Sequence, residues 1–417
     1  MERKWIFGNA ELHSSKRFLA SLIFCVGLSC GISEVSAQEE DVENLQVDLN
    51  THASSESLLN SDQVFLPQSM AALGDSISAG LFANFSRKNA NLPWIETWFV
   101  LRSLSAATIW QLKGLEKKDF AWSAGYNTHG KVLTHARRLA ALDPSRSLKV
   151  MNVAHSGDTV LDILSEQLPK LNAASQKNLG QAYPDYVTIL VGANDICAKD
   201  MTDTTSVQDF HDRLDKVVSE ILEKSPRTKV MLSSLPNIDR LRKVAWGARL
   251  WGWGALKKCE DVWNLVKLCP TLTTIEDPIV RDAVKQRVDD FNLVARDVAD
   301  RHNQDHAGRI RFTEETFKVA FTADHLSMDC FHPNPSGQNE LSRATFSSSW
   351  WPTDGKFDSE LLAKMHLKTK CDSEHSREAA GSASRSNSYR MSSECWKYFY
   401  RTPDEDKNIG SIKYYKD

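Results

Sequence analysis

Residues 68–80, Gln68-Ser-Met-Ala-Ala-Leu-Gly-Asp-Ser-Ile-Ser-Ala-Gly80, indicate how the folded part of the chain begins. The short apolar run at their start is typical of a buried strand. Gly74 allows the chain to bend sharply after it, and Asp75 can cap the first turn of a helix. Ser76 would then stand at a strand-to-helix turn, where backbone N–H groups point at any developing anion. Gly-Asp-Ser is also an ordinary turn and N-cap, so a catalytic reading of Ser76 needs support from the rest of the chain.

Four more short apolar runs follow this one at wide intervals, at residues 148–153, 186–191, 229–235 and 309–312. Segments with helical spacing separate them, for example residues 210–222 and 280–302. Strands that alternate with helices form βαβ units, in which helices cover both faces of a parallel sheet. The sequence therefore predicts a three-layer α/β/α sandwich with a five-stranded parallel sheet. Ligands of such sheets bind at the carboxyl ends of the strands.

Polar residues follow the second and third strands of this predicted sheet. Asn152-Val-Ala-His-Ser-Gly-Asp158 places Gly157 where its N–H is unobstructed, and Val191-Gly-Ala-Asn-Asp195 places Asn194 at the next strand end. The N–H groups of Ser76 and Gly157 and the side-chain amide of Asn194 would together form an oxyanion hole. We interpret His155 and Asp158 as a hydrogen-bonded structural pair, and expect Asp195 to hold its own loop.

After the fifth strand, Met328-Asp-Cys-Phe-His-Pro-Asn-Pro-Ser-Gly337 supplies Asp329 and His332. A spacing of three puts both side chains on one side of a helical turn. The carboxylate can then orient the imidazole while the other ring nitrogen faces Ser76. Asp329 and His332 are therefore the candidate orienting acid and general base.

Four strand ends thus carry, in order, a serine, a glycine, an asparagine and an Asp-x-x-His pair. In this order and spacing the chain resembles the SGNH (GDSL) hydrolases, which have a flavodoxin-like fold. The resemblance implies that Ser76 is the nucleophile, that Ser76, Gly157 and Asn194 bind the oxyanion, and that His332 is the base with Asp329. It also implies acyl transfer to the serine and then to water, with neither a metal nor an organic cofactor.

Within that family the chain is most similar to the phospholipase B-like lipases, over residues 66–352. The similar stretches are Met70-Ala-Ala-Leu-Gly-Asp-Ser76, Ala121-Trp-Ser-Ala-Gly125, Val191-Gly-Ala-Asn-Asp-Ile-Cys197, Asp329-Cys-Phe-His-Pro333 and Gln338-Asn-Glu-Leu-Ser-Arg343. The resemblance implies a lipase or phospholipase that acts on ester-containing lipids. A carbohydrate O-acetylesterase would use the same residues and stays an alternative. A non-catalytic lipid- or glycan-binding module is disfavoured, because all the catalytic and oxyanion residues are present.

One segment bears on how a lipid would be bound. Residues 240–258 carry Trp246, Trp251 and Trp253 among basic residues, which is typical of an interfacial segment. Our hypothesis is a lid or a lipid-docking element that works at a membrane surface. The alternative is a helix whose tryptophans pack on the domain. The near balance of 51 Lys+Arg against 54 Asp+Glu gives no reason to expect a nucleic-acid partner.

The N-terminus indicates export from the cytoplasm. Lys16 and Arg17 precede the apolar residues 18–32, a run shorter than the ~20 residues that a membrane span needs. Residues 35–37, Val-Ser-Ala, provide small residues for signal-peptide cleavage before Gln38. We therefore expect a signal peptide at 1–37 and a secreted or periplasmic protein, with an uncleaved anchor as the alternative. Residues 38–65 are then an acidic leader, and 353–417 a partly disordered extension with a loop at 373–393.

Of the eight cysteines, Cys25 and Cys30 lie in the signal segment. An even remainder in an exported chain favours disulfides. Short loops would join Cys259 to Cys269 and Cys371 to Cys395, which leaves Cys197 and Cys330. The spacings do not fit a zinc site.

Overall fold

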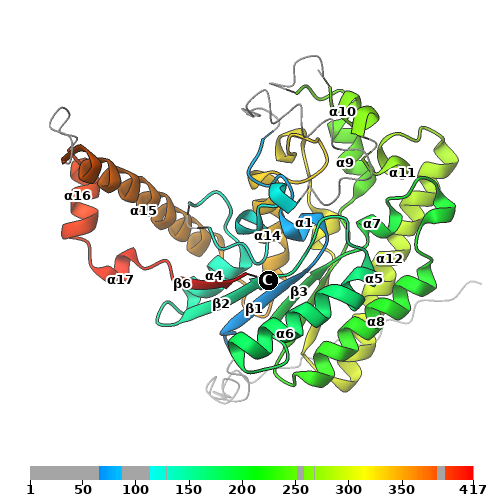
Figure 1. The fold of residues 1–417 in the computed structure, drawn as a ribbon, viewed down its shortest axis with the longest axis horizontal. Coiled ribbons are helices and arrows are strands. Elements are labelled where there is room, and N and C mark those ends of the chain that lie inside the picture. The colour runs from blue at the N-terminus through cyan, green and yellow to red at the C-terminus, as the bar shows by residue number, and fades with distance from the viewer. Residues whose placement is uncertain are drawn as a thin grey trace, which may run out of the picture. The chain divides into compact units, whose positions relative to one another are not determined.

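The protein is known from a computed structural model, which describes residues 65–86, 113–127, 129–250, 258–266, 268–382 and 390–416. Its centre is a six-stranded, wholly parallel sheet with the strand order β5-β4-β3-β1-β2-β6 (Figure 1). The strands are β1 (Ser69–Gly74), β2 (Ser147–Asn152), β3 (Tyr186–Leu190), β4 (Lys229–Ser233), β5 (Ile310–Thr313) and β6 (Ser411–Tyr415).

Helices connect these strands. The described α-helices are α1 (Ser76–Ala79), α4 (His135–Leu142), α5 (Val160–Asp162), α6 (Leu168–Leu179), α7 (Ala193–Ile196), α8 (Val207–Lys224), α9 (Ile238–Ala245), α10 (Cys259–Val266), α11 (Pro270–Thr273), α12 (Pro278–Asp305), α13 (Glu315–Lys318), α14 (Pro335–Ser347), α15 (Gly355–Ser382), α16 (Ser393–Tyr400) and α17 (Asp404–Lys407). Short 3-10 turns are η2 (Lys113–Leu115), η3 (Lys118–Phe120), η5 (Met201–Asp203) and η6 (Ala323–His325), and η4 (Ile163–Gln167) is a π-helix.

The predicted α/β sandwich is confirmed, and alternation along β1 explains its layers. Ala71 and Leu73 point into a core formed with α6, α8 and α12. Met70 and Ala72 point to the opposite face, where they join a core with α4 and α14. Successive side chains of a strand face opposite sides of a sheet, so a run of apolar residues is buried on both faces. The predicted helices at 210–222 and 280–302 are α8 and α12.

The five predicted strands are confirmed, but the strand count is wrong by one. β6 pairs with β2 in parallel register, from Ser147 opposite Ser411 to Met151 opposite Tyr415. It is an edge strand whose residues are exposed or half-buried. A continuous apolar run is therefore missing from it, and the pattern that identifies the central strands is absent.

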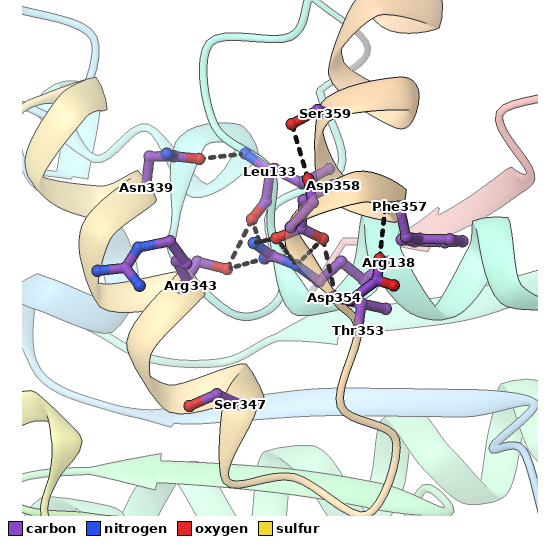
Figure 2. A network of polar contacts seen from close by, with 12 residues as sticks. Leu133, Arg138, Asn339, Arg343, Ser347, Thr353, Asp354, Phe357, Asp358 and Ser359 are labelled. Carbon is purple, nitrogen blue, oxygen red and sulfur yellow. Dashed lines mark hydrogen bonds and ion pairs between the residues drawn. The ribbon is translucent and has the colours of Figure 1, made fainter.

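The residues that lead to β6 include α15, which contacts α4 and Leu133 just before it. The guanidinium of Arg138, which is 2% exposed, donates to both carboxylate oxygens of Asp358 at 2.9 and 2.7 Å and to Ser342 Oγ at 2.9 Å (Figure 2). Leu133, just before α4, packs with Leu361 and other apolar residues of α15. The expected loop at 373–393 is wrong for residues 373–382, which continue α15, while 383–389 lie outside the described residues.

Three disulfides are formed among the described residues, and two of them differ from the expectation. Cys371 bonds to Cys395 as predicted and joins α15 to α16. The predicted Cys259–Cys269 pair is wrong. Cys259 bonds to Cys330, and Cys269 bonds to Cys197.

The predicted signal peptide and most of the acidic leader lie outside the described residues. Among the residues that are described, no helix is long and apolar enough to cross a membrane.

Candidate active site

The turn between β1 and α1 positions Ser76. Gly74 has φ +145°, and a Cβ there would lie 2.3 Å from the carbonyl oxygen of Leu190 on the neighbouring strand. Asp75 is the N-cap of α1, and its Oδ1 accepts the N–H of Ile77 at 2.9 Å. Ser76 is therefore the first residue of a helical turn at the carboxyl end of β1, as the sequence predicts (Figure 1).

The structure brings Ser76, His332 and Asp329 together. His332 Nε2 lies 2.7 Å from Ser76 Oγ, and His332 Nδ1 lies 2.5 Å from Asp329 Oδ2. All three residues are buried, with exposed fractions of 8%, 3% and 5%. The predicted hydrogen-bonded relay is thus present, with the imidazole between a hydroxyl and a carboxylate.

The loop that carries Asp329 and His332 is a turn and not the helical turn we expected. Cys330 adopts φ +61°, a left-handed conformation that interrupts any helix. Asp329 Oδ1 accepts the N–H of Phe331 at 3.1 Å and of His332 at 3.0 Å. One carboxylate oxygen therefore organises the turn, while the other holds the imidazole.

Gly157 and Asn194 follow β2 and β3, the two strands that flank β1. Gly157 is exposed and has φ +93°. Asn194 is half-buried in α7, and its Nδ2 donates to the carbonyl oxygen of Asp158 at 2.9 Å. An amide nitrogen has two hydrogens, and this bond uses one of them. The two predicted donors thus lie on the same sheet edge as Ser76.

Burial strongly raises the pKa of two carboxyl groups, each next in sequence to a predicted site residue. Burial raises the pKa of Asp75 to about 7, although the Ile77 N–H and the His332 ring lower it. Burial raises the pKa of Asp195 to about 6 as well. Asp195 Oδ2 accepts the N–H of Val160 at 3.0 Å, and its Oδ1 accepts the hydroxyl of Thr205 at 2.9 Å. Asp195 therefore holds its loop, as expected.

Sequence reasoning did not identify two residues that support the site. The indole N–H of Trp263, a fully buried residue of α10, donates to the carbonyl oxygen of Asp329 at 3.2 Å. Gln338 accepts the N–H of Trp122 at 2.9 Å and donates to the carbonyl oxygen of Ile77 at 3.1 Å. It therefore links α14 to α1. Both are distant in sequence from their partners. No local pattern marks Trp263, and Gln338 begins a stretch, 338–343, that resembles the family without a role being assigned to it.

The tryptophan-rich segment is described only in part. Trp246 directly follows α9, is 47% exposed, and has the Arg242 guanidinium 4.6 Å from its ring centroid. Trp251 and Trp253 lie outside the described residues. Within the described ranges, no group of three or more His, Cys, Asp or Glu side chains is placed to hold a metal ion.

A profile of the family described as GDSL-like lipase/acylhydrolase matches residues 70–345. No curated protein matches the chain. Among solved structures, a family two carbohydrate esterase from Clostridium thermocellum is 12% identical, with 66% of this chain and 61% of that one covered and a TM-score of 0.35. An extracellular lipase from Streptomyces rimosus is 17% identical, with coverages of 67% and 98% and a TM-score of 0.34. An acetyl xylan esterase from Geobacillus stearothermophilus is 16% identical, with coverages of 69% and 96% and a TM-score of 0.36.

Proposed function

The chain belongs to the GDSL-like lipase/acylhydrolase family, and we propose that it hydrolyses lipid esters with Ser76 as the nucleophile. The observation that carries this proposal is the relay in which His332 Nε2 lies 2.7 Å from Ser76 Oγ and Nδ1 lies 2.5 Å from Asp329. A hydroxyl is a weak nucleophile, so it needs an adjacent base that is itself held by a third group.

The steps follow from this geometry. His332 Nε2 takes the proton of Ser76 as Oγ bonds to the ester carbonyl carbon, and the carbonyl oxygen becomes an anion. His332 then gives that proton to the departing alcohol as the ester C–O bond breaks. Water, deprotonated by His332, attacks the acyl-enzyme and releases the acid, and the proton returns to Ser76. The Asp329 carboxylate stabilises the imidazolium in both halves.

The oxyanion is bound, in this proposal, by the N–H groups of Ser76 and Gly157 and by Nδ2 of Asn194. The Asp158 carbonyl fixes the orientation of the Asn194 amide before substrate arrives. Donors that are already oriented toward the developing charge need no reorganisation during the reaction, and the loss of one lowers kcat by about 10²–10³-fold.

A lipid substrate is supported by the exposed Trp246 beside Arg242, which presents an indole and a cation at the surface. Indoles favour the headgroup region of a membrane, and cations attract lipid phosphates. Trp246→Ala should therefore lower hydrolysis of phospholipid vesicles and leave hydrolysis of a soluble short-chain ester unchanged. Equal losses on the two substrates would reject the interfacial role.

The proposed reaction is tested by fatty-acid release from phosphatidylcholine and from its lyso form. Wild type should release fatty acid, and Ser76→Ala should lose at least about 10³-fold of that rate. Ser175→Ala, a buried serine of α6, is the matched control and should keep the wild-type rate. Turnover of acetyl esters alone, with no fatty acid released, would replace the lipase by the carbohydrate O-acetylesterase.

We also propose export of the chain, because the described residues hold three disulfides, which persist in oxidising compartments. N-terminal sequencing of the mature protein should give Gln38 as the first residue. A mature chain that still begins at Met1 would contradict cleavage and favour the anchor.

A further inference from the structure

Gln167 is a buried side chain at the end of the π-helix η4, between α5 and α6. It is 1% exposed, although it is polar. A π-helical turn adds a residue to a helix and is frequent at functional sites. A buried amide also needs hydrogen-bond partners, because an unpartnered one is costly.

The partners of Gln167 lie at the nucleophile turn. Its Oε1 accepts the N–H of Gly74 at 3.0 Å, and its Nε2 donates to the carbonyl oxygen of Gly74 at 2.8 Å. One side chain thus binds the N–H and the C=O of the residue that ends β1. Ser76 is two residues further on, so the position of this backbone sets the position of its hydroxyl.

The same amide reaches the loop that follows β2. Gln167 Nε2 also donates to Asp158 Oδ2 at 2.7 Å, and the carbonyl oxygen of Asp158 accepts the amide of Asn194 at 2.9 Å. Asp158 directly follows Gly157. A continuous series of hydrogen bonds therefore runs from Gly74 through Gln167 and Asp158 to Asn194.

We propose that Gln167 is a positioning residue that fixes the nucleophile turn relative to the two oxyanion donors, Gly157 and Asn194. The inference rests on the proposed function. A displacement of about 1 Å at a reacting centre lowers the rate by about 10²-fold. The geometry of the oxyanion hole matters in the tetrahedral state more than in the bound ester, so the effect falls on kcat and not on KM.

The test is Gln167→Met, which keeps the length of the side chain and removes its hydrogen bonds. Asn172→Leu is the matched control, since Asn172 is an amide of the adjoining helix α6 that donates to the carbonyl oxygen of Ala182 at 3.2 Å, before β3 begins. On a soluble ester we expect Gln167→Met to lower kcat by about 10–100-fold with KM within about twofold of wild type. Asn172→Leu should keep the wild-type kcat and KM, although its Tm should fall about as much as that of Gln167→Met.

A double-mutant cycle separates positioning from loss of stability. In an Asn194→Ala background, Gln167→Met should lower kcat by a smaller factor than it does in the wild type, because one of the two donors that it positions is already absent. Full additivity, or a kcat loss in Asn172→Leu equal to that in Gln167→Met, would overturn the proposal.

A milder variant keeps the test valid if Gln167→Met fails to fold. Asp158→Ala removes one of the three hydrogen bonds of Gln167 and leaves both bonds to Gly74. It should lower kcat by about 3–10-fold and be non-additive with Asn194→Ala, and an unchanged kcat would refute the link. Failure of the proposed function is recognised separately, by ester hydrolysis that persists in Ser76→Ala.

Discussion

The carboxyl group of Asp75 allows a prediction about stability that can be tested without any substrate. Asp75 is fully buried beside Ser76, and its Oδ1 accepts the N–H of Ile77. Its Oδ2 is buried and has no hydrogen-bond partner among the described residues. Burial disfavours the ionised form and raises the pKa of this group to about 7. Asp75→Asn keeps an oxygen for Ile77 and removes the charge.

The size of the effect follows from the pKa. A rise in the pKa of Asp75 from 3.8 to about 7 means that the folded protein favours the protonated over the ionised carboxyl by about 4 kcal/mol more than the unfolded chain does. The folded state binds this proton more tightly than the unfolded state does. The free energy of unfolding of the wild type therefore falls as the pH rises from about 4 to about 7, and this contribution is constant above that range. The Asp75→Asn variant has no such contribution, so its free energy of unfolding increases relative to that of the wild type over the same pH range.

The assay is thermal unfolding of both proteins between pH 4 and pH 9. The unfolding entropy is about 2 cal/mol/K per residue, summed over the unit of residues 61–417. Dividing a stability difference of about 4 kcal/mol by this entropy gives a Tm for Asp75→Asn about 5 °C above that of the wild type. We expect the two proteins to differ most above pH 7, and their Tm difference to shrink toward pH 4. Asp195→Asn is a comparison variant: burial raises the pKa of Asp195 only to about 6, so its pH-dependent change in Tm should end near pH 6. Both carboxylate oxygens of Asp195 accept hydrogen bonds, and an amide would lose one of them. A Tm difference that does not change with pH would refute the reasoning.

Three further predictions concern the site and the C-terminal region. Asp329→Asn should lower kcat on a soluble ester by about 10⁴-fold, because an amide favours the wrong imidazole tautomer; a change below tenfold would contradict its role. Asp358→Ala leaves the buried guanidinium of Arg138 without its carboxylate and should lower the free energy of unfolding in urea by about 3 kcal/mol; a loss under 1 kcal/mol would show that water replaces the ion pair. Serine at both Cys371 and Cys395 opens a loop with a sequence separation of 24 and should remove about 3 kcal/mol of stability, measured the same way, with kcat unchanged.

The sheet was predictable from the sequence wherever burial is complete. Residues of β1 and β3 are buried on both faces, so their apolar runs stand out against helical spacing. β6 alternates exposed Ser411 and Lys413 with half-buried residues at the edge of the sheet. Its place depends on pairing with β2 and on packing against α4, and its own five residues encode neither contact.

The site was predictable where its chemistry is local. Three of the four motifs directly follow β1, β2 and β3, which are neighbours in the sheet and bring their carboxyl ends to one edge. The fourth, with Asp329 and His332, comes after α13 and η6, so the segment beyond β5 carries it to that edge. Gln167, by contrast, lies 93 residues from Gly74 in sequence, and Trp263 lies 66 residues from Asp329. Such contacts arise from packing between whole elements. The candidate reacting groups are therefore visible in a single sequence, while the side chains that would position them are not.

The disulfides are a second case in which contacts between distant segments could not be predicted from the sequence. Proximity in sequence favours a bond between Cys259 and Cys269, but the actual bonds, Cys259–Cys330 and Cys197–Cys269, have sequence separations of 71 and 72. Closing a loop of about 70 residues restricts the unfolded chain by about 2 kcal/mol more than closing one of about 10. The long-range bonds also attach residues 259–269 both to the end of α7 and to the turn that bears the imidazole. A local bond would have left those two parts of the candidate site without a covalent link to residues 259–269. The observed pairing therefore adds covalent restraint where the proposed chemistry needs a fixed geometry.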